Sequence, residues 1–218
     1  MGLLAPLAHS GAYTDAHYLL YDGTDPEFTG VYSIGEPYLP PSVRLQPLKS
    51  AKEAMVTAVD AMITGGIDDR VGAVAFSSIA QWVEPLTADY ARVRAKLRGA
   101  PLGVASGLSV GLEAARLEFL SGRARPKTAK VMVLVTDGRS GSMNALTEAQ
   151  AAAQAGITIH VVGVGPDADR VLLDEIAAIG GGTATYVDMA VPAWVYTPVL
   201  QAALVNAVTT GSAVSLVE

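Results

Sequence analysis

Two hydrophobic periods alternate along the chain from about residue 45 onward. In one, apolar residues recur every three or four positions, which is typical of amphipathic helices; in the other, short apolar runs are nearly continuous, which is typical of strands buried on both faces. The helical pattern covers 47–64, 87–97, 104–120, 146–155, 167–179 and 194–208, and the strand pattern covers 70–76, 130–136, 157–164 and 184–187, with a short hairpin-like piece at 81–84. Together with one earlier strand candidate, this alternation predicts a doubly wound α/β fold, a mostly parallel six-stranded sheet with helices on both faces.

The first 44 residues differ from the rest because they are rich in Gly, Pro, Tyr and Asp. Their strand candidate, 17–21, ends at Asp22, and the following segment, 23–43, has four prolines and little periodicity. A loop of this length inside a compact domain is uncommon and usually has a function. We expect residues 1–218 to form one domain with a core over about 15–210 and a long irregular loop at 23–43.

Composition removes several classes of function. Half of the 218 residues are hydrophobic and 17% are charged, which indicates a compact globular chain. The net charge of −6 and the lack of a basic run argue against nucleic acid and anionic membranes as partners. The chain has no cysteine, and no apolar run is long enough for a transmembrane helix, so we expect no direct membrane insertion. These features fit a cytoplasmic protein, or equally a soluble extracytoplasmic piece of a membrane-anchored one.

Candidate chemistry is found where predicted strands end, because parallel sheets bind ligands at the carboxyl ends of their strands. Asp22 follows the strand candidate at 17–21, and Asp137 follows the strand at 130–136. Two carboxylates with a nearby hydroxyl, such as that of Thr24, offer the oxygen ligands that Mg²⁺ prefers. The simpler alternative is that Asp137 caps the next turn or helix and that Asp22 and Thr24 are turn and surface residues.

Four segments resemble von Willebrand factor type A (vWA) domains in their order and spacing: 66–77, 85–94, Val-Leu-Val-Thr-Asp-Gly at 133–138, and Ala-Gly-Ile-Thr-Ile-His-Val-Val-Gly-Val-Gly at 155–165. The helix, glycine turn and short strand over 172–186 also fit. The resemblance implies a Rossmann-like fold of the bacterial vWA type and a metal-ion-dependent adhesion site (MIDAS). That site is built in the family from Asp-x-Ser-x-Ser after the first strand, a Thr before a later helix, and the Asp of Thr-Asp-Gly.

The resemblance also implies that this metal site is degenerate. Asp22 and Thr24 fit the first motif, but Pro26 takes the place of its second serine. Asp137 fits the Thr-Asp-Gly position. At the family's threonine the chain has either Ala100 or Leu102, neither of which can coordinate a cation. The remaining ligands, Asp22, Thr24 and Asp137, would hold Mg²⁺ or Mn²⁺ weakly.

The string Ser-Gly-Ser-Met at 140–143 echoes the family's first metal loop, although it follows a different strand. We interpret it as a turn in which Ser140 or Ser142 caps the next helix; the alternative is that these serines add oxygen ligands to the same site. A serine hydrolase using Ser140 is a weaker alternative, because the Gly-x-Ser-x-Gly elbow lacks its last glycine. His160, the histidine downstream of Ser140, lies in an apolar strand pattern and is predicted to be structural.

The function that follows from the resemblance is that of a protein-binding, adhesion or assembly module, not an enzyme. In the family, a carboxylate of the partner completes the coordination of the cation, so the expected partner is a protein with an acidic side chain. The alternative is a metal-independent scaffold that binds through the 23–43 loop. In that case Tyr32 and Tyr38 offer aromatic area of the kind found at interface hot spots.

Overall fold

The structure is a computed structural model that describes residues 47–66, 68–76, 79–99, 107–136, 142–165, 168–188 and 193–212. Its elements, in chain order, are α3 (Pro47–Thr64), β1 (Val71–Phe76), β2 (Ala80–Thr87), α4 (Tyr90–Arg98), α5 (Leu108–Phe119), β3 (Lys130–Thr136), α6 (Ser142–Gln154), β4 (Ile157–Val164), α7 (Arg170–Ile179), β5 (Gly181–Val187) and α8 (Ala193–Ser212). The strand candidate at 17–21 and the loop at 23–43 lie outside the described residues.

The described strands form two sheets. β3, β4 and β5 lie parallel in that order, with Thr136 opposite Gly163 and Val164 opposite Val187. β1 and β2 form an antiparallel hairpin. The prediction of a parallel α/β sheet is therefore confirmed over β3–β5, and the sixth predicted strand is the one outside the described residues.

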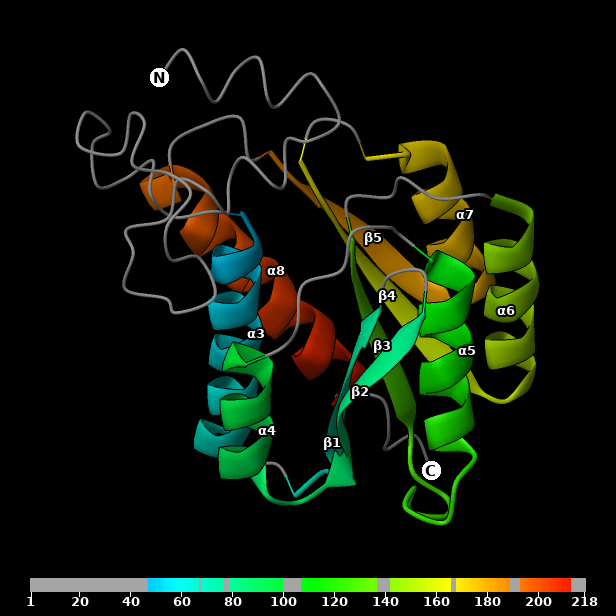
Figure 1. The fold of residues 1–218 in the computed structure, drawn as a ribbon, viewed down its shortest axis with the longest axis horizontal. Helices are drawn as coiled ribbons and strands as arrows, with labels where there is room; N and C mark the ends of the chain where they lie inside the picture. Colours follow the sequence, from blue (N-terminus) through cyan, green and yellow to red (C-terminus); the bar gives the residue numbers. More distant parts are fainter. Residues whose placement is uncertain are drawn as a thin grey trace.

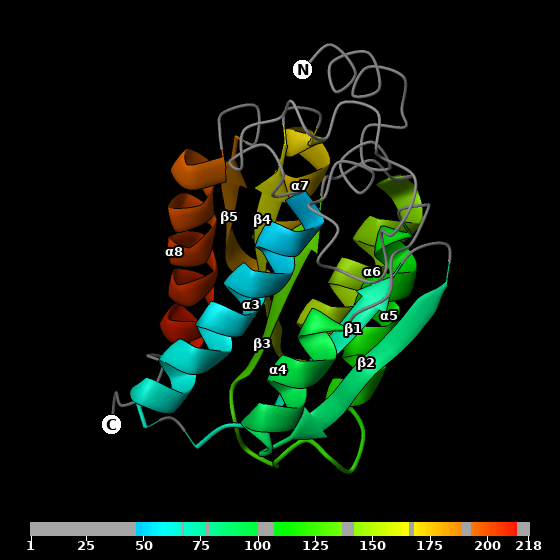
Figure 2. The same ribbon diagram turned by 60° about the vertical axis from the view of Figure 1, so that its left-hand side comes forward.

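Helices cover both faces of the β3–β5 sheet (Figures 1 and 2). One core cluster lies between that sheet and α5, α6 and α7, and it includes the fully buried Leu112, Ile159 and Leu173. A second cluster lies on the opposite face, where Leu200 and Leu204 of α8 meet α3 and the sheet. A third, smaller cluster joins α3 and α4 beside β1. The result is the helix–sheet–helix layering that the alternating pattern predicts.

Burial along the strands follows their number of neighbours. Most residues of β4, the central strand of its sheet, are buried, as expected for a strand covered on both faces and paired on both edges. Every residue of β1 is instead partly exposed, so the expectation that this strand is buried on both faces was wrong. Within the described ranges β1 pairs with β2 alone and β3 pairs with β4 alone, which leaves one edge of each without a described neighbour.

Several helices begin at other residues than the periodicity predicts, because caps and not apolar spacing set their ends. The carboxylate of Asp89 accepts the N–H of Arg92, so α4 starts at Tyr90 and not at residue 87. Asp169 does the same for Leu172, so α7 starts at Arg170 and not at residue 167. α5 starts four residues later than predicted and α6 four residues earlier.

Candidate functional site

The candidate site is the rim of the sheet where β3, β4 and β5 end at Thr136, Val164 and Val187. In both ribbon views α3, α5, α6, α7 and α8 begin at this same end of the sheet (Figures 1 and 2). The first turn of a helix has free N–H groups and the positive end of the helix dipole. Several helix starts at one rim therefore favour negative charge there, whether on aspartates of the chain or on a ligand.

β3 leads the chain directly to this rim. Its last residue, Thr136, is 7% exposed and pairs with Gly163 in the parallel ladder. Asp137 is the next residue in the sequence. The end of this strand thus has the surroundings that the sequence predicts: a buried parallel ladder followed by an acidic residue.

The predicted site residues themselves lie outside the part of the chain that the structure describes. This holds for the predicted metal ligands and for the predicted partner-binding tyrosines, namely Asp22, Thr24, Asp137, Ser140, Tyr32 and Tyr38. Ser142 is the first residue of α6, with its side chain outside the description. The structure therefore does not test whether these residues meet, and among the residues it does describe, no three acidic or histidine side chains gather as metal ligands.

One further candidate ligand follows from the observed start of α5. The sequence pattern predicted this helix from residue 104, and the family resemblance put Ala100 or Leu102, in the loop before it, at the threonine position. The helix begins at Leu108 after the cap residue Gly107, so the residue just ahead of the cap is Ser106. Glycine is among the residues preferred at a helix N-cap, so Gly107 could have indicated this start and, with it, the hydroxyl of Ser106.

Two buried polar side chains join the first turns of α3 and α8 at the rim. The hydroxyls of Ser50 and Tyr196 lie 3.3 Å apart, and both residues are buried. Burial raises the pKa of Tyr196, so its hydroxyl stays neutral and can donate. The pair holds the starts of two helices together across 146 residues of sequence, which stabilises this side of the rim.

A polar groove lies on the other side, between the first turns of α5 and α6. Its walls are Ser109, Glu113, Asn144, Thr147 and Glu148, and it encloses about 220 Å³. Arg116 donates hydrogen bonds to the Glu148 carboxylate from Nη2 at 3.0 Å and from Nε at 3.1 Å, so the two side chains form an ion pair. The groove offers hydroxyl, amide and carboxylate groups to a partner at the rim.

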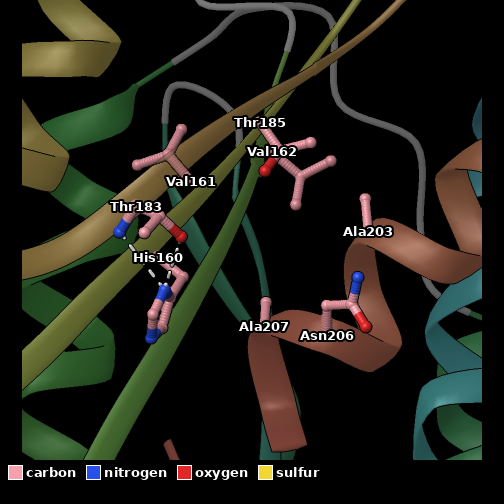
Figure 3. Close-up of a pocket in the computed structure, with 8 residues that line it drawn as sticks. All are labelled: His160, Val161, Val162, Thr183, Thr185, Ala203, Asn206 and Ala207. Atoms are coloured by element: carbon pink, nitrogen blue, oxygen red, sulfur yellow. Dashed lines mark hydrogen bonds between the residues drawn. The ribbon is translucent and has the colours of Figure 1, made fainter. Parts of the chain in front are cut away.

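His160 confirms the prediction of a structural histidine (Figure 3). The residue is 5% exposed and lies in the middle of β4, three positions before Gly163. The backbone N–H of Thr183 donates to its Nδ1 at 3.2 Å, and the hydroxyl of Thr183 lies 3.0 Å from the same nitrogen. Because Nδ1 accepts a main-chain hydrogen bond, the neutral ring has its proton on Nε2. The imidazole thus takes the place of a backbone acceptor where the β4–β5 register shifts.

A cavity of about 50 Å³ lies beside this histidine, between β4, β5 and α8. Thr183, Thr185 and Asn206 give it a polar lining (Figure 3). A water molecule takes up about 30 Å³ in the liquid, so the cavity suits water and not a substrate. The burial of His160 and its bonds to Thr183 thus fit a structural role in the β4–β5 pairing.

We expect the stability of the fold to depend on pH through His160. Burial lowers the pKa of His160 below its ordinary 6.5, so the unfolded chain binds this proton more readily than the folded one. The stabilising contribution of the neutral ring is therefore complete above pH 6.5 and is lost as the pH falls from there through the lowered folded pKa. Thermal unfolding measured over a series of mildly acidic pH values checks this expectation.

The matched variant is His160→Asn, because the Asn oxygen can accept the Thr183 N–H in place of Nδ1 but does not titrate. Its melting temperature should fall less than that of the wild type over the same acidic range. An equal fall in both proteins would contradict the assignment.

Comparisons with known proteins place these features in a family. A sequence model of the von Willebrand factor type A domain matches residues 41–194. The matched span includes Asp137, Ser140 and Ser142 and begins after Asp22 and Thr24. No curated protein sequence gives a significant match.

Solved structures show the same fold at low sequence identity. BatB from Bacteroides thetaiotaomicron is 20% identical, with a TM-score of 0.64 over 77% of this chain and 89% of that one. A von Willebrand factor type A protein from Catenulispora acidiphila is 21% identical, with a TM-score of 0.56 over 78% of this chain and 40% of that one. Proximal thread matrix protein 1 from the mussel byssus, with a zinc-occupied MIDAS motif, is 19% identical, with a TM-score of 0.60 over 74% and 42%.

The described helices also bear on the membrane question. Within the described ranges, no helix combines the length and apolar character needed to cross a membrane.

Proposed function

Because the chain belongs to the von Willebrand factor type A family, we propose that it is a protein-binding module that uses the rim of its sheet. In this proposal a divalent cation at the rim joins the domain to an acidic side chain of the partner. The observation that carries the proposal is the end of β3, where the buried Thr136 pairs with Gly163 and is followed in the sequence by Asp137.

The proposed ligand set is Asp22, Thr24 and Asp137, with Ser106 as a further hydroxyl donor and Ser140 or Ser142 as alternatives to it. Carboxylates and hydroxyls are hard oxygen donors, and with waters they can fill the six positions that Mg²⁺ or Mn²⁺ requires. The zinc-occupied MIDAS motif of the mussel-byssus protein supports metal binding by a domain of this fold. Fewer protein ligands mean more retained water, so we propose weak binding of the cation.

The electrostatics of the rim support an acidic partner. The starts of α5, α6 and α8 bring positive dipole ends to the strand ends. A bound cation adds positive charge and leaves a coordination position for a carboxylate. The groove between α5 and α6, with Glu113 and Asn144 on its walls, then receives the polar residues that flank this carboxylate.

The experiment is a thermal melt of the whole chain with Mg²⁺, with Mn²⁺ and with a chelator. A cation that binds only the folded state raises the free energy of unfolding by RT ln(1 + c/Kd), where c is the cation concentration, or about 2.7 kcal/mol when c is a hundred times Kd. The melting temperature rises accordingly. We expect a rise at millimolar cation, reversed by the chelator and abolished in Asp137→Ala.

The matched control is Asp188→Ala, because Asp188 follows β5 as Asp137 follows β3 but lies at the far edge of the sheet. This variant should retain the full response to cations. If the melting temperature of the wild-type protein is unchanged by both cations and by the chelator, the metal-dependent form of the proposal is wrong.

A second candidate is metal-independent binding through the 23–43 loop. Its support is compositional: the loop carries Tyr32 and Tyr38, and large aromatic residues are enriched among binding hot spots. If a partner is captured equally well in chelator, and Tyr32→Ala with Tyr38→Ala removes the capture, this candidate replaces the first one.

A further inference from the structure

The outer edge of β5 has no strand neighbour among the described residues. The strand reads Gly-Gly-Thr-Ala-Thr-Tyr-Val, with no charged residue and no proline, and its residues up to Tyr186 are exposed or partly exposed. Within the described part of the chain it pairs with β4 on one side and with no strand on the other. Sheet edges in proteins are usually blocked by charges, prolines, bulges or covering elements, because free N–H and C=O groups pair with other chains.

In the other described sheet, the β1–β2 hairpin, β2 shows such protection. Pro85 lies inside β2 and offers no N–H, and the N–H of the next residue, Leu86, donates to the buried Glu118 carboxylate at 2.9 Å. Arg123 holds that carboxylate in place through two hydrogen bonds of 2.7 Å. β2 therefore contains a proline, one of the features that limit edge pairing, whereas β5 contains no charged residue and no proline.

The printed hydrogen bonds fix which backbone groups of β5 face outward. The C=O of Val187 accepts from Gly165 at the end of β4, and the N–H of Thr183 donates to His160 of β4, so these residues face inward. Successive residues of a strand direct their backbone groups to opposite edges. Ala184 and Tyr186 therefore present their N–H and C=O groups to the outer edge, while hydrogen bonds to Arg170 and Asp174 hold the Tyr186 hydroxyl against α7.

We propose that β5 is a self-association site, where it pairs antiparallel with β5 of a second copy of this chain. Ala184 of each copy exchanges backbone hydrogen bonds with Tyr186 of the other, which sets the two-fold axis at Thr185. The two Thr185 side chains then face each other as a non-hydrogen-bonded pair, an arrangement that favours threonine on both strands. The small Ala184 leaves room for the Tyr186 side chain of the opposite strand.

A second copy fits this edge better than a foreign peptide does. Proteins that bind extended peptides at a sheet edge select them with pockets for alternate side chains. The cavity beside Thr183 and Thr185 is about 50 Å³, which suits water and not a side chain. Self-pairing needs no pocket, and an uncharged strand places no like charges opposite each other across the two-fold axis.

Sedimentation of the wild-type chain over a wide concentration range tests the proposal, which does not depend on the rim or on a metal. Because one strand pair is a small contact, we expect a weak monomer–dimer equilibrium. Thr185→Lys sets two ammonium groups against each other at the axis and should weaken the association at least about tenfold. Ala184→Pro removes an outward N–H and should do the same, while the melting temperature of the dilute monomer shows whether each variant is folded.

A cysteine scan fixes the register, since the chain has no cysteine of its own. In a non-hydrogen-bonded pair the Cα atoms lie about 4.5 Å apart, within the range that a disulfide spans. Oxidation should therefore crosslink Thr185→Cys and leave Thr183→Cys uncrosslinked. The proposal is overturned if the wild-type chain stays monomeric at all concentrations. It is equally overturned if both edge variants leave a dimer intact, because the dimer contact then lies elsewhere.

Discussion

Gly182→Ala is expected to destabilise the fold by about 3 kcal/mol, which lowers the melting temperature by roughly 6–12 °C in a chain of this size. A Cβ at Gly182 would lie 2.1 Å from the carbonyl oxygen of Ile159 and 3.1 Å from the backbone nitrogen of His160. Both are main-chain atoms of the central strand, so no side-chain movement relieves the contact. The start of β5 must instead move away from β4 and lose the Thr183 hydrogen bond to His160.

Two neighbouring glycines separate this steric effect from the general cost of replacing a glycine. A Cβ at Gly181 meets nothing within 4 Å, but the residue has a φ of +64°, so Gly181→Ala should cost about 1 kcal/mol. Gly122 has open space and no positive φ, so Gly122→Ala should change little. Thermal melts of the three variants should follow the order 182, then 181, then 122; equal losses at 182 and 122 would contradict the close approach.

The layers of the fold could be predicted from the sequence because they rest on hydrophobic periodicity. The runs at 130–136 and 157–164 match β3 and β4 to the residue, since strands of a parallel sheet covered by helices on both faces are largely apolar. The start of α3 at Pro47 was predicted correctly, but the starts of α4 and α7 could not be read from apolar periodicity. They depend on single capping residues such as Asp89 and Asp169, which fall outside the apolar period.

The edges of the sheet were also beyond periodicity. β5 was predicted from residue 184 because glycines usually end elements, yet Gly181 and Gly182 belong to the strand. Gly182 is needed there because the chain passes so close to Ile159 that a side chain does not fit, and Gly181 is favoured there by its positive φ of 64°. β1 and β5 each have one edge without a neighbour in the described part of the chain, and a local pattern does not reveal which strands lie at an edge.

The candidate site is predictable in kind but not in composition. The strand end before Asp137 follows from the pattern, because parallel strands present their carboxyl ends at one rim. Which hydroxyls join it depends on loop lengths, as the shift of the α5 start to Leu108 shows for Ser106. The serines and aspartates of such loops have no periodic pattern of their own, so their assignment depends on the family match. That match covers residues 41–194, which include Asp137 but not Asp22.

Charge substitutions in the predicted first strand should have an equally large effect. We predict that residues 17–21 pair as a strand between β1 and β3, since each of these has one edge without a described neighbour. A strand there is covered on both faces, so both Leu19→Asp and Leu20→Asp should destabilise the fold by about 3 kcal/mol or more. Thermal melts measure this loss, and Leu4→Asp, outside the predicted strand, is the control expected to change stability by less than about 0.5 kcal/mol.

The two leucine variants must be read as a pair. Adjacent residues of a strand point to opposite faces, so a strand at the surface would tolerate aspartate at one of the two positions. Losses at both positions support a central strand that ends at Asp22 beside β3, and so support a shared cation site for Asp22 and Asp137. Tolerance at either position removes Asp22 and Thr24 from the proposed ligand set. Asp137 is then the one carboxylate left in that set, which is too little negative charge to hold Mg²⁺ against its hydration.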